Sequence, residues 1–200
     1  MAYMSRQDRR CAILDAAVAL VQREGLSAAT VRGVAQILDC SPGQIHHHFP
    51  SADDLRAEAI REIWNGISPA LETAIRQLAP RERLMALLSR GGRDKDDELQ
   101  SLCKTTDKLW REAIWASHME HSVRLAVLES IERWRVVIAE TLEEGRSQNI
   151  FPDREDAQTI ATRLISAVLG YDLLVKLGTS GQSEASQADF VTDLLATEGL

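Results

Sequence analysis

The sequence predicts an all-α protein with about nine helices, and three features support this fold class. Apolar residues recur at spacings of three and four along most of the chain, which is the period of one face of an α-helix. The alternation of apolar and polar residues that is typical of half-buried strands is absent. Glycine and proline fall at widely spaced positions between the periodic segments. We therefore expect helices joined by short connections, with no sheet.

The N-terminal region predicts three helices of decreasing length. Residues 6–24 carry apolar side chains on one face, and Gly25 ends this helix as a left-handed cap. Thr30 is a suitable N-cap for a second helix that extends to about residue 38. After a turn at Asp39-Cys40, Ser41-Pro42 combines a good N-cap with proline at the first helical position. We expect the third helix over residues 42–48.

A capping box predicts the start of a fourth, longer helix. Ser51 is followed by Asp54 three residues later, and a helix over residues 53–78 follows, which Pro80 closes. The polar segments 91–97 and 178–186 are expected to be a loop and a linker. The remaining helices are expected over residues 81–89, 98–117, 121–146, 153–177 and 186–197. We divide the chain into domains at 1–52 and 53–200.

The two short N-terminal helices and the tight turn between them form the pattern of a helix-turn-helix, whose second helix enters the major groove of DNA. In that second helix, Ile45 and Phe49 are expected to be buried. A glutamine can pair with adenine through its amide, histidine can contact a base or a phosphate, and glycine permits close approach of the backbone. The residues expected to be exposed are Gly43, Gln44, His46 and His47.

The charge distribution agrees with a DNA partner only when the chain is divided. The net charge of −7 argues against a protein that coats nucleic acid. Residues 1–52, however, contain five arginines and four acids, a net charge of +1, so residues 53–200 carry −8. The N-terminal domain also holds three of the five histidines. We expect selective DNA binding that depends on salt and pH, and that relies on dimerisation and base contacts.

In combination, these N-terminal residues resemble the TetR family of bacterial transcriptional regulators, over about a quarter of the chain. The residues that carry the resemblance are Ile13, Leu14, Ala16, Ala17, Glu24, Gly25, Thr30, Val34, Ala35, Ser41, Pro42, Gly43, Ile45, His48, Phe49, Ser51, Asp54 and Leu55. The resemblance implies a repressor that reads a palindromic operator as a homodimer and is released by a small-molecule effector. Three residues depart from the family's frequent choices, namely His46 for tyrosine, Ala52 for lysine and Asp39 for glycine.

The resemblance also implies roles for individual residues of the helix-turn-helix. Arg32 aligns with a position that reaches a base or a phosphate. Positions that face base edges are Pro42, Gly43, Gln44 and His47. Positions that contact the DNA backbone are Thr30, His46 and His48.

For the C-terminal domain, the resemblance implies an antiparallel helical body that binds the effector and dimerises through its last two long helices as a four-helix bundle. The expected dimer residues are Leu164, Ile165, Val168, Leu169, Leu173, Phe190 and Leu194. All four tryptophans lie in this domain, and an aromatic cleft with a few polar groups is typical of a ligand site. The expected pocket residues are Trp64, Leu102, Cys103, Trp110, Trp134 and Tyr171.

Several alternatives remain open from the residues alone. Three consecutive histidines with Cys40 suggest a metal site, but neighbours on a helix point about 100° apart, so we expect no metal. The tryptophans and cysteines can equally be core residues. An acid–base site could be assembled from His118, His121, Glu112 and Glu120, but no nucleophile or phosphate loop accompanies them, so we expect no enzyme.

A further alternative is a helical interaction module that has lost operator binding, for which His46 and Ala52 would be the signs. The three cysteines form no paired framework, and the sequence shows no signal peptide and no long apolar run. We therefore expect a cytoplasmic protein without a membrane span, and we expect no cofactor.

Overall fold

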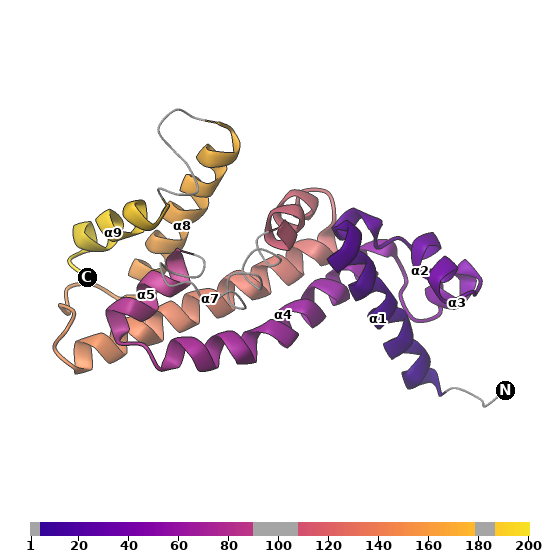
Figure 1. The fold of residues 1–200 in the computed structure, drawn as a ribbon, viewed down its shortest axis with the longest axis horizontal. Helices are drawn as coiled ribbons and strands as arrows, with labels where there is room; N and C mark the ends of the chain where they lie inside the picture. Colours follow the sequence, from indigo (N-terminus) through magenta and orange to yellow (C-terminus); the bar gives the residue numbers. More distant parts are fainter. Residues whose placement is uncertain (1–4, 90–107, 179–186) are drawn as a thin grey trace. The chain divides into compact units, whose positions relative to one another are not determined.

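The computed structural model describes residues 5–89, 108–178 and 187–200, and throughout these ranges it is helical and contains no strand, which confirms the all-α prediction (Figure 1). A 3₁₀ turn, η1 (Leu26–Ala28), follows the first helix, and residues 108–117 form another helix. The other helices are α1 (Arg6–Glu24), α2 (Val31–Ile37), α3 (Pro42–His46), α4 (Ala52–Arg76), α5 (Pro80–Leu88), α7 (His121–Ser147), α8 (Ala157–Lys176) and α9 (Gln187–Glu198).

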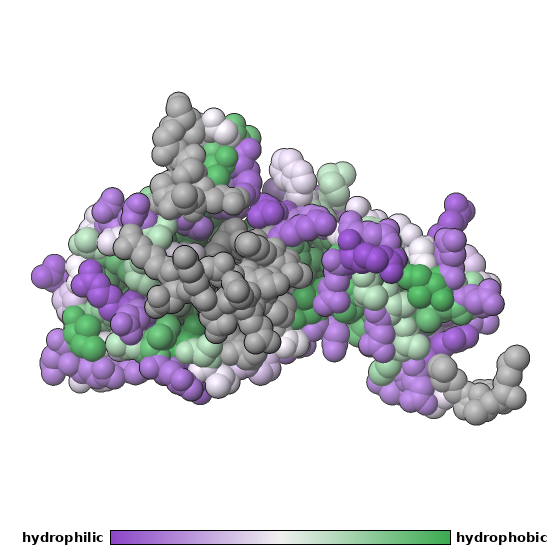
Figure 2. Space-filling view, viewed as in Figure 1, coloured by the Kyte–Doolittle hydropathy of each residue, from purple (hydrophilic) through white to green (hydrophobic). Residues whose placement is uncertain are grey.

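The chain forms two compact units. One contains Met1–Pro69 with Ser101–Ser130, and the other contains Ala70–Gln100 with Ile131–Leu200. The helix α4 is continuous through Pro69, although proline there removes a backbone donor from the helix. The face drawn in Figure 2 shows hydrophilic side chains interspersed with apolar ones. No described helix is long and apolar enough to cross a membrane.

The core of the first unit joins α1, α2 and α3. Ile13 and Ala17 of α1, Val34 of α2 and Ile45 of α3 are fully buried, as is Phe49 just after α3 to within 1%. A capping box starts α1, because Ser5 accepts from the Asp8 N–H and the Asp8 carboxylate accepts from the Ser5 N–H. These local signals and the apolar face together fix the helix that supports the helix-turn-helix.

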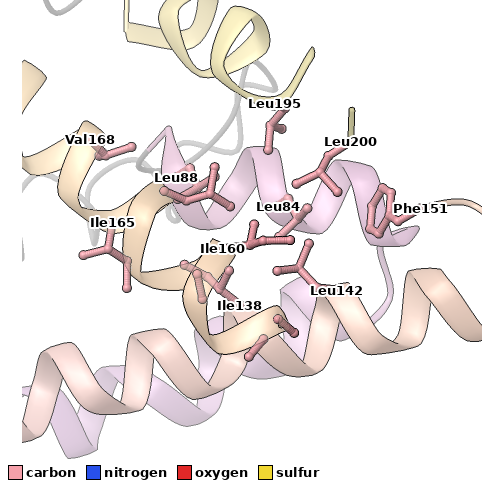
Figure 3. Close-up of a cluster of buried hydrophobic side chains, with 14 of the residues drawn as sticks. Leu84, Leu88, Ile138, Leu142, Phe151, Ile160, Ile165, Val168, Leu195 and Leu200 are labelled. Atoms are coloured by element: carbon pink, nitrogen blue, oxygen red, sulfur yellow. The ribbon is translucent and has the colours of Figure 1, made fainter. Parts of the chain in front are cut away.

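The core of the second unit is formed by α5, α7, α8 and α9 (Figure 3). Gly145 of α7 is needed there, because a Cβ at this position would overlap the ring of Phe151. The members of this core that Figure 3 labels are Leu84, Leu88, Ile138, Leu142, Phe151, Ile160, Ile165, Val168, Leu195 and Leu200.

The start of α8 differs from the sequence prediction. The helix begins at Ala157 and not at residue 153, because the Asp156 carboxylate accepts from the Thr159 N–H at 2.8 Å and so caps the helix. Pro152-Asp153 lies outside the helix. The expected loop 91–97, most of the linker 178–186 and the first ten residues of the helix expected over 98–117 lie outside the described residues.

Candidate nucleic-acid interface

The helix α3 presents the residues that the sequence assigned to DNA. Ser41 in an extended conformation precedes it, and Pro42 occupies its first turn. Ile45 and Phe49 are buried beneath it, as expected. The exposed residues are Pro42, Gly43, Gln44, His46 and His47. The helix therefore offers amide, imidazole and backbone groups on a rigid apolar base.

The helix α2 and the turn after it hold α3 in place. Thr30 caps α2, because its hydroxyl accepts from the Gly33 N–H at 3.0 Å. Asp39 has a φ of 47°, so the aspartate adopts the left-handed conformation that the turn requires. The Cys40 N–H then donates to the Ala35 carbonyl at 2.9 Å. Arg32 on α2 is exposed.

The helix α1 brings arginines to the same surface. Arg9 donates from Nη2 to Oε1 of Gln44 at 2.8 Å. Arg10 lies over the ring of Phe49, 4.8 Å from its centroid, and pairs with Glu58 at 3.0 Å. The first turn of α1 is therefore attached to α3 and to α4.

The histidines have different surroundings. A ring nitrogen of His46, Nδ1, lies 3.2 Å from the carbonyl oxygen of Pro50. Burial and the positive charges of Arg6, His47, Arg10 and Arg9 lower the pKa of His48 below 6.5. These surroundings therefore favour the neutral form of the His48 imidazole in the free protein. Among the described residues, no group of three or more His, Cys, Asp or Glu side chains could hold a metal ion.

Acidic residues at the start of α4 bind the start of α7 within the first unit. The Asp53 carboxylate accepts from the backbone N–H groups of Ser122 and Val123, both at 3.0 Å, so α4 caps α7. The Ser122 hydroxyl donates to Asp54 at 2.7 Å. The Ser51–Asp54 contact at the start of α4 is also present, as the sequence predicted.

Glu112 and Glu120, which the sequence offered for an acid–base site, also bind other elements of the first unit. The Glu112 Oε2 accepts from the Leu26 N–H at 2.5 Å, which holds the turn after α1. Glu120 pairs with Arg56 of α4 at 2.7 Å, and the Arg56 side chain is only 14% exposed. Both carboxylates therefore have a structural partner.

Two of the expected pocket residues lie in contact within the first unit. Trp64 of α4 and Trp110 lie with their ring centroids 5.6 Å apart and their planes at 87°. Trp134 and Tyr171 belong to the second unit, where Tyr171 stacks on Phe190 at 4.3 Å. Leu102 and Cys103 lie outside the described residues.

The expected dimer residues divide by burial. Ile165 and Val168 belong to the core of their own chain (Figure 3), as does Leu164, and all three present little surface to a partner. Leu169, Phe190 and Leu194 are partly buried against that core. Leu173 is 56% exposed. Leu173 is therefore the most exposed of the expected dimer residues.

Comparison with known proteins identifies the family. Residues 13–59, from the core of α1 to the first turns of α4, match the model described as bacterial regulatory proteins, tetR family. The HTH-type transcriptional regulator BetI of Cronobacter sakazakii is 28% identical over 177 residues, covering 87% of this chain and 81% of the relative. BetI of Rhizobium meliloti is 33% identical over 81 residues, about 40% of each chain. The chain belongs to the TetR family. It is a DNA-binding transcriptional regulator.

Solved structures of TetR-family and related regulators share the whole fold. A transcriptional regulator from Saccharomonospora viridis, crystallised in complex with choline, is 28% identical with a TM-score of 0.70, and the match covers 96% of this chain and 97% of that one. A TetR-family regulator from Cytophaga hutchinsonii, at 19% identity and a TM-score of 0.73, covers 98% of this chain and 97% of that one and shows the same fold.

Sequence reasoning missed residues on both sides of the TetR motif. Arg9 and Arg10 precede the residues that match the family model, and the sequence indicated them only as positive charge. Glu112 lies far beyond the motif, and its contact with Leu26 joins positions 86 residues apart. The clustering of arginines at positions 6, 9 and 10, about one turn of helix, was the available signal for the first group.

Proposed function

We propose that this regulator is a repressor that reads a palindromic operator as a homodimer, with α3 of each copy in the major groove, and that a small molecule releases it. The observation that carries this proposal is the surface of α3, where Gly43, Gln44 and His47 are exposed above buried Ile45 and Phe49. Residues 1–52 would contact the operator, and residues 53–200 would bind the effector and the second copy.

We assign base contacts to Pro42, Gly43, Gln44 and His47, backbone contacts to Thr30, His46 and His48, and a contact with a base or a phosphate to Arg32. The Thr30 cap of α2 and the buried Ile45 of α3 support these roles because they fix the two helices that carry the polar side chains, although the Ser41 side chain makes no cap hydrogen bond at the start of α3. Each phosphate that a positive side chain neutralises adds a slope of about −0.9 to the dependence of log K on log salt. A net charge of +1 in this domain supports few such contacts, so base contacts would supply much of the selectivity.

The operator experiment tests the DNA proposal. Binding of the purified protein to DNA that flanks its own gene should weaken steeply as salt rises. His47→Ala should alter the preference among operator variants, whereas His46→Ala should weaken binding to all of them. Expression of a reporter from the same DNA should rise when the regulator is deleted. Absence of a salt-dependent complex, or a fall in reporter expression, would contradict the proposal.

The homodimer is proposed to form through an exposed face of α8. Leu173 and Leu177 are 56% and 71% exposed, although they are apolar. On the same face, a Cβ at Gly170 would meet no atom within 4 Å, so nothing within the described residues requires a glycine there. Glycine in a helix interior costs about 1 kcal/mol relative to alanine. A helix from a second copy packed closely against this face would account for both observations.

Sedimentation velocity tests this face. Leu173→Glu places a charge in the proposed interface and should convert dimers to monomers at micromolar concentration. Thr192→Glu, on an exposed position of α9 that contacts Met85 of the same chain, is a control for added charge in the second unit. A monomeric wild-type protein, or a dimeric Leu173→Glu variant, would contradict the interface.

For the effector, we propose a small quaternary ammonium compound. Trp64 and Trp110 lie edge to face, at 5.6 Å and 87°, and together they would supply two walls of an aromatic enclosure of the kind that attracts such cations. The choline complex of the Saccharomonospora viridis regulator, whose sequence is 28% identical, supports the same chemical class. A contact of this kind is worth about 1–2 kcal/mol when the cation is desolvated.

A link from Trp110 to the turn after α1 supports a mechanism by which a ligand releases DNA. Trp110 and Glu112 lie two residues apart on one helix, and Glu112 holds the turn after α1. A ligand that displaces Trp110 would therefore also shift Glu112 and the turn that Glu112 holds. The distance between the α3 helices of the two copies would then no longer match the operator.

Choline and its neutral isostere 3,3-dimethylbutanol provide the test. Choline should quench tryptophan fluorescence and release DNA, and the isostere, which has the same shape without the charge, should do so at least about tenfold less effectively. Trp110→Leu should lose this selectivity, whereas Trp115→Leu should keep it because Trp115 is 77% exposed at the end of the same helix. Equal effects of the two ligands would contradict the cation class.

A further inference from the structure

One side chain from α1 orients the glutamine of the recognition helix. Arg9 Nη2 donates to Oε1 of Gln44 at 2.8 Å, across a separation of 35 residues. Arg9 is half-buried and Gln44 is exposed. Neither side chain belongs to the buried apolar core of the first unit. The bond therefore acts on the direction of the amide group.

The chemistry of arginine determines which end of the amide faces it. A guanidinium has five N–H donors and no acceptor, so only the amide oxygen of Gln44 can meet it in a hydrogen bond. The alternative orientation would bring the amide NH₂ against the donors of Arg9. With its oxygen held by Arg9, Gln44 directs its NH₂ group outward, where DNA would lie.

The backbone of Arg9 is itself fixed, so the direction of the guanidinium is not accidental. The Arg9 N–H donates to the Ser5 carbonyl at 3.0 Å in the first turn of α1. The next residue, Arg10, is held by Glu58 and by the ring of Phe49. The first turn of α1 is thus attached at two points beside α3.

We propose that Arg9 is a specificity-determining residue that makes Gln44 a hydrogen-bond donor to DNA. This inference rests on the proposed function, in which Gln44 faces a base edge. A glutamine pairs with adenine through two bonds, in which its NH₂ donates to N7 and its oxygen accepts from N6. Arg9 occupies one of the two lone pairs of that oxygen and holds it toward α1, so the group left facing the base is the amide NH₂, which would meet the N6 donor of adenine. Guanine offers two acceptors, N7 and O6, and thymine offers O4.

We therefore expect guanine or thymine to be preferred to adenine at the Gln44 position, because adenine places a donor, N6, beside its one acceptor, N7. Arg9 retains four other N–H groups, which can contact a phosphate while Nη2 holds Gln44. Loss of Arg9 would then have two separate effects. Binding would weaken on all sequences, and the preference at one base pair would shift toward adenine.

Selection from randomised duplexes by the full-length protein tests the proposal. Gln44→Ala first identifies the base pair that Gln44 reads, because its preference should disappear in that variant. At this pair the wild type should select guanine or thymine. Arg9→Met, which removes the donors and keeps a side chain of similar length, should increase the affinity for adenine relative to guanine by about tenfold.

Arg6→Met is the matched control, since Arg6 lies one turn earlier on the same helix and also acts electrostatically on His48. It should weaken binding without changing any base preference. Replacing the hydrogen-bond donor at position 9 by an acceptor gives a second test. Arg9→Glu offers only acceptors, so Gln44 should then present its oxygen and favour adenine or cytosine.

The outcomes separate this inference from the function it rests on. If Gln44→Ala changes no base preference, Gln44 does not read a base and that part of the proposed function fails. If Gln44→Ala does abolish a preference, but the wild type selects adenine there or Arg9→Met leaves the preference unchanged, only the role of Arg9 is overturned. In that case the bond to Gln44 is a surface contact that DNA breaks.

Discussion

Replacing Glu112 by alanine should weaken the attachment between the helix over residues 108–117 and the end of α1. The Glu112 carboxylate accepts from the Leu26 N–H at 2.5 Å. It also covers Gly25, since a Cβ at that glycine would lie 2.9 Å from both carboxylate oxygens. Leu26 is only 2% exposed, so its N–H loses its partner when the carboxylate is removed.

The expected magnitude follows from the chemistry of that one bond. A hydrogen bond to a charged group contributes about 1.5–3 kcal/mol, and we take about 1.5 kcal/mol because the Glu112 side chain is 34% exposed and water can partly replace it. The contact of Lys108 with Glu112 at 3.9 Å adds little, since pairs at the surface are worth about 0–1 kcal/mol. Glu112→Gln keeps a neutral acceptor and should lose about 0.5 kcal/mol.

Two measurements check this order of effects. The melting temperature of Glu112→Ala should fall by about 3–6 °C, because 1 kcal/mol corresponds to about 2–4 °C for a chain of this size. Hydrogen exchange at the Leu26 amide should accelerate by about tenfold, and by less in Glu112→Gln. Lys108→Ala is the control and should leave that amide protected. An unchanged exchange rate at Leu26 in Glu112→Ala would refute the role of this bond.

Three further predictions concern single positions. Gly145→Ala should lower the free energy of unfolding in urea by about 1–3 kcal/mol, because its Cβ overlaps Phe151, whereas Gly66→Ala, which has open space, should raise it slightly. The hydroxyls of two serines lower the pKa of Asp54 below 3.8, so its contribution to stability is present above that pH and is lost as the pH falls through the lowered value. Asp54→Asn should therefore be less stable at pH 7 and lose less stability on acidification, as thermal melts from pH 7 to about pH 2.5 will show. Thr30→Ala should cost about 1 kcal/mol and Thr30→Ser much less, measured by urea unfolding, because only the serine keeps the hydroxyl that caps α2.

The helix-turn-helix could be predicted closely because its signals are local. Thr30 caps α2, Asp39 adopts the left-handed conformation, and Ser41-Pro42 starts α3 within the next turn. The start of α8 could not be chosen in the same way, because Pro152-Asp153 and Asp156 are both good start signals. Only the structure shows that the Asp156 carboxylate reaches the free N–H of Thr159.

The effector and dimer residues could not be separated from core residues by sequence. An apolar face of a helix has the same period whether it packs inside its own chain or against a partner. Leu164 and Val168 pack inside, while Leu173, one and a half turns further along α8, is exposed. The contacts of Arg9 with Gln44 and of Glu112 with Leu26 were likewise unpredictable, because they join distant parts of the chain.

Several acidic residues of the first unit have partners within the chain that offset their charge. In the first unit, Glu58, Glu120 and Glu129 lie against arginines, and the Asp53 carboxylate caps α7. Charge that is neutralised within a few ångströms has little effect on a duplex beyond the Debye length of about 8 Å at physiological salt. A duplex at α3 would instead meet the first turn of α1, where positive arginine side chains are close enough to lower the pKa of His48. The local charge at this surface, and not the net charge of −7, therefore governs the encounter with DNA.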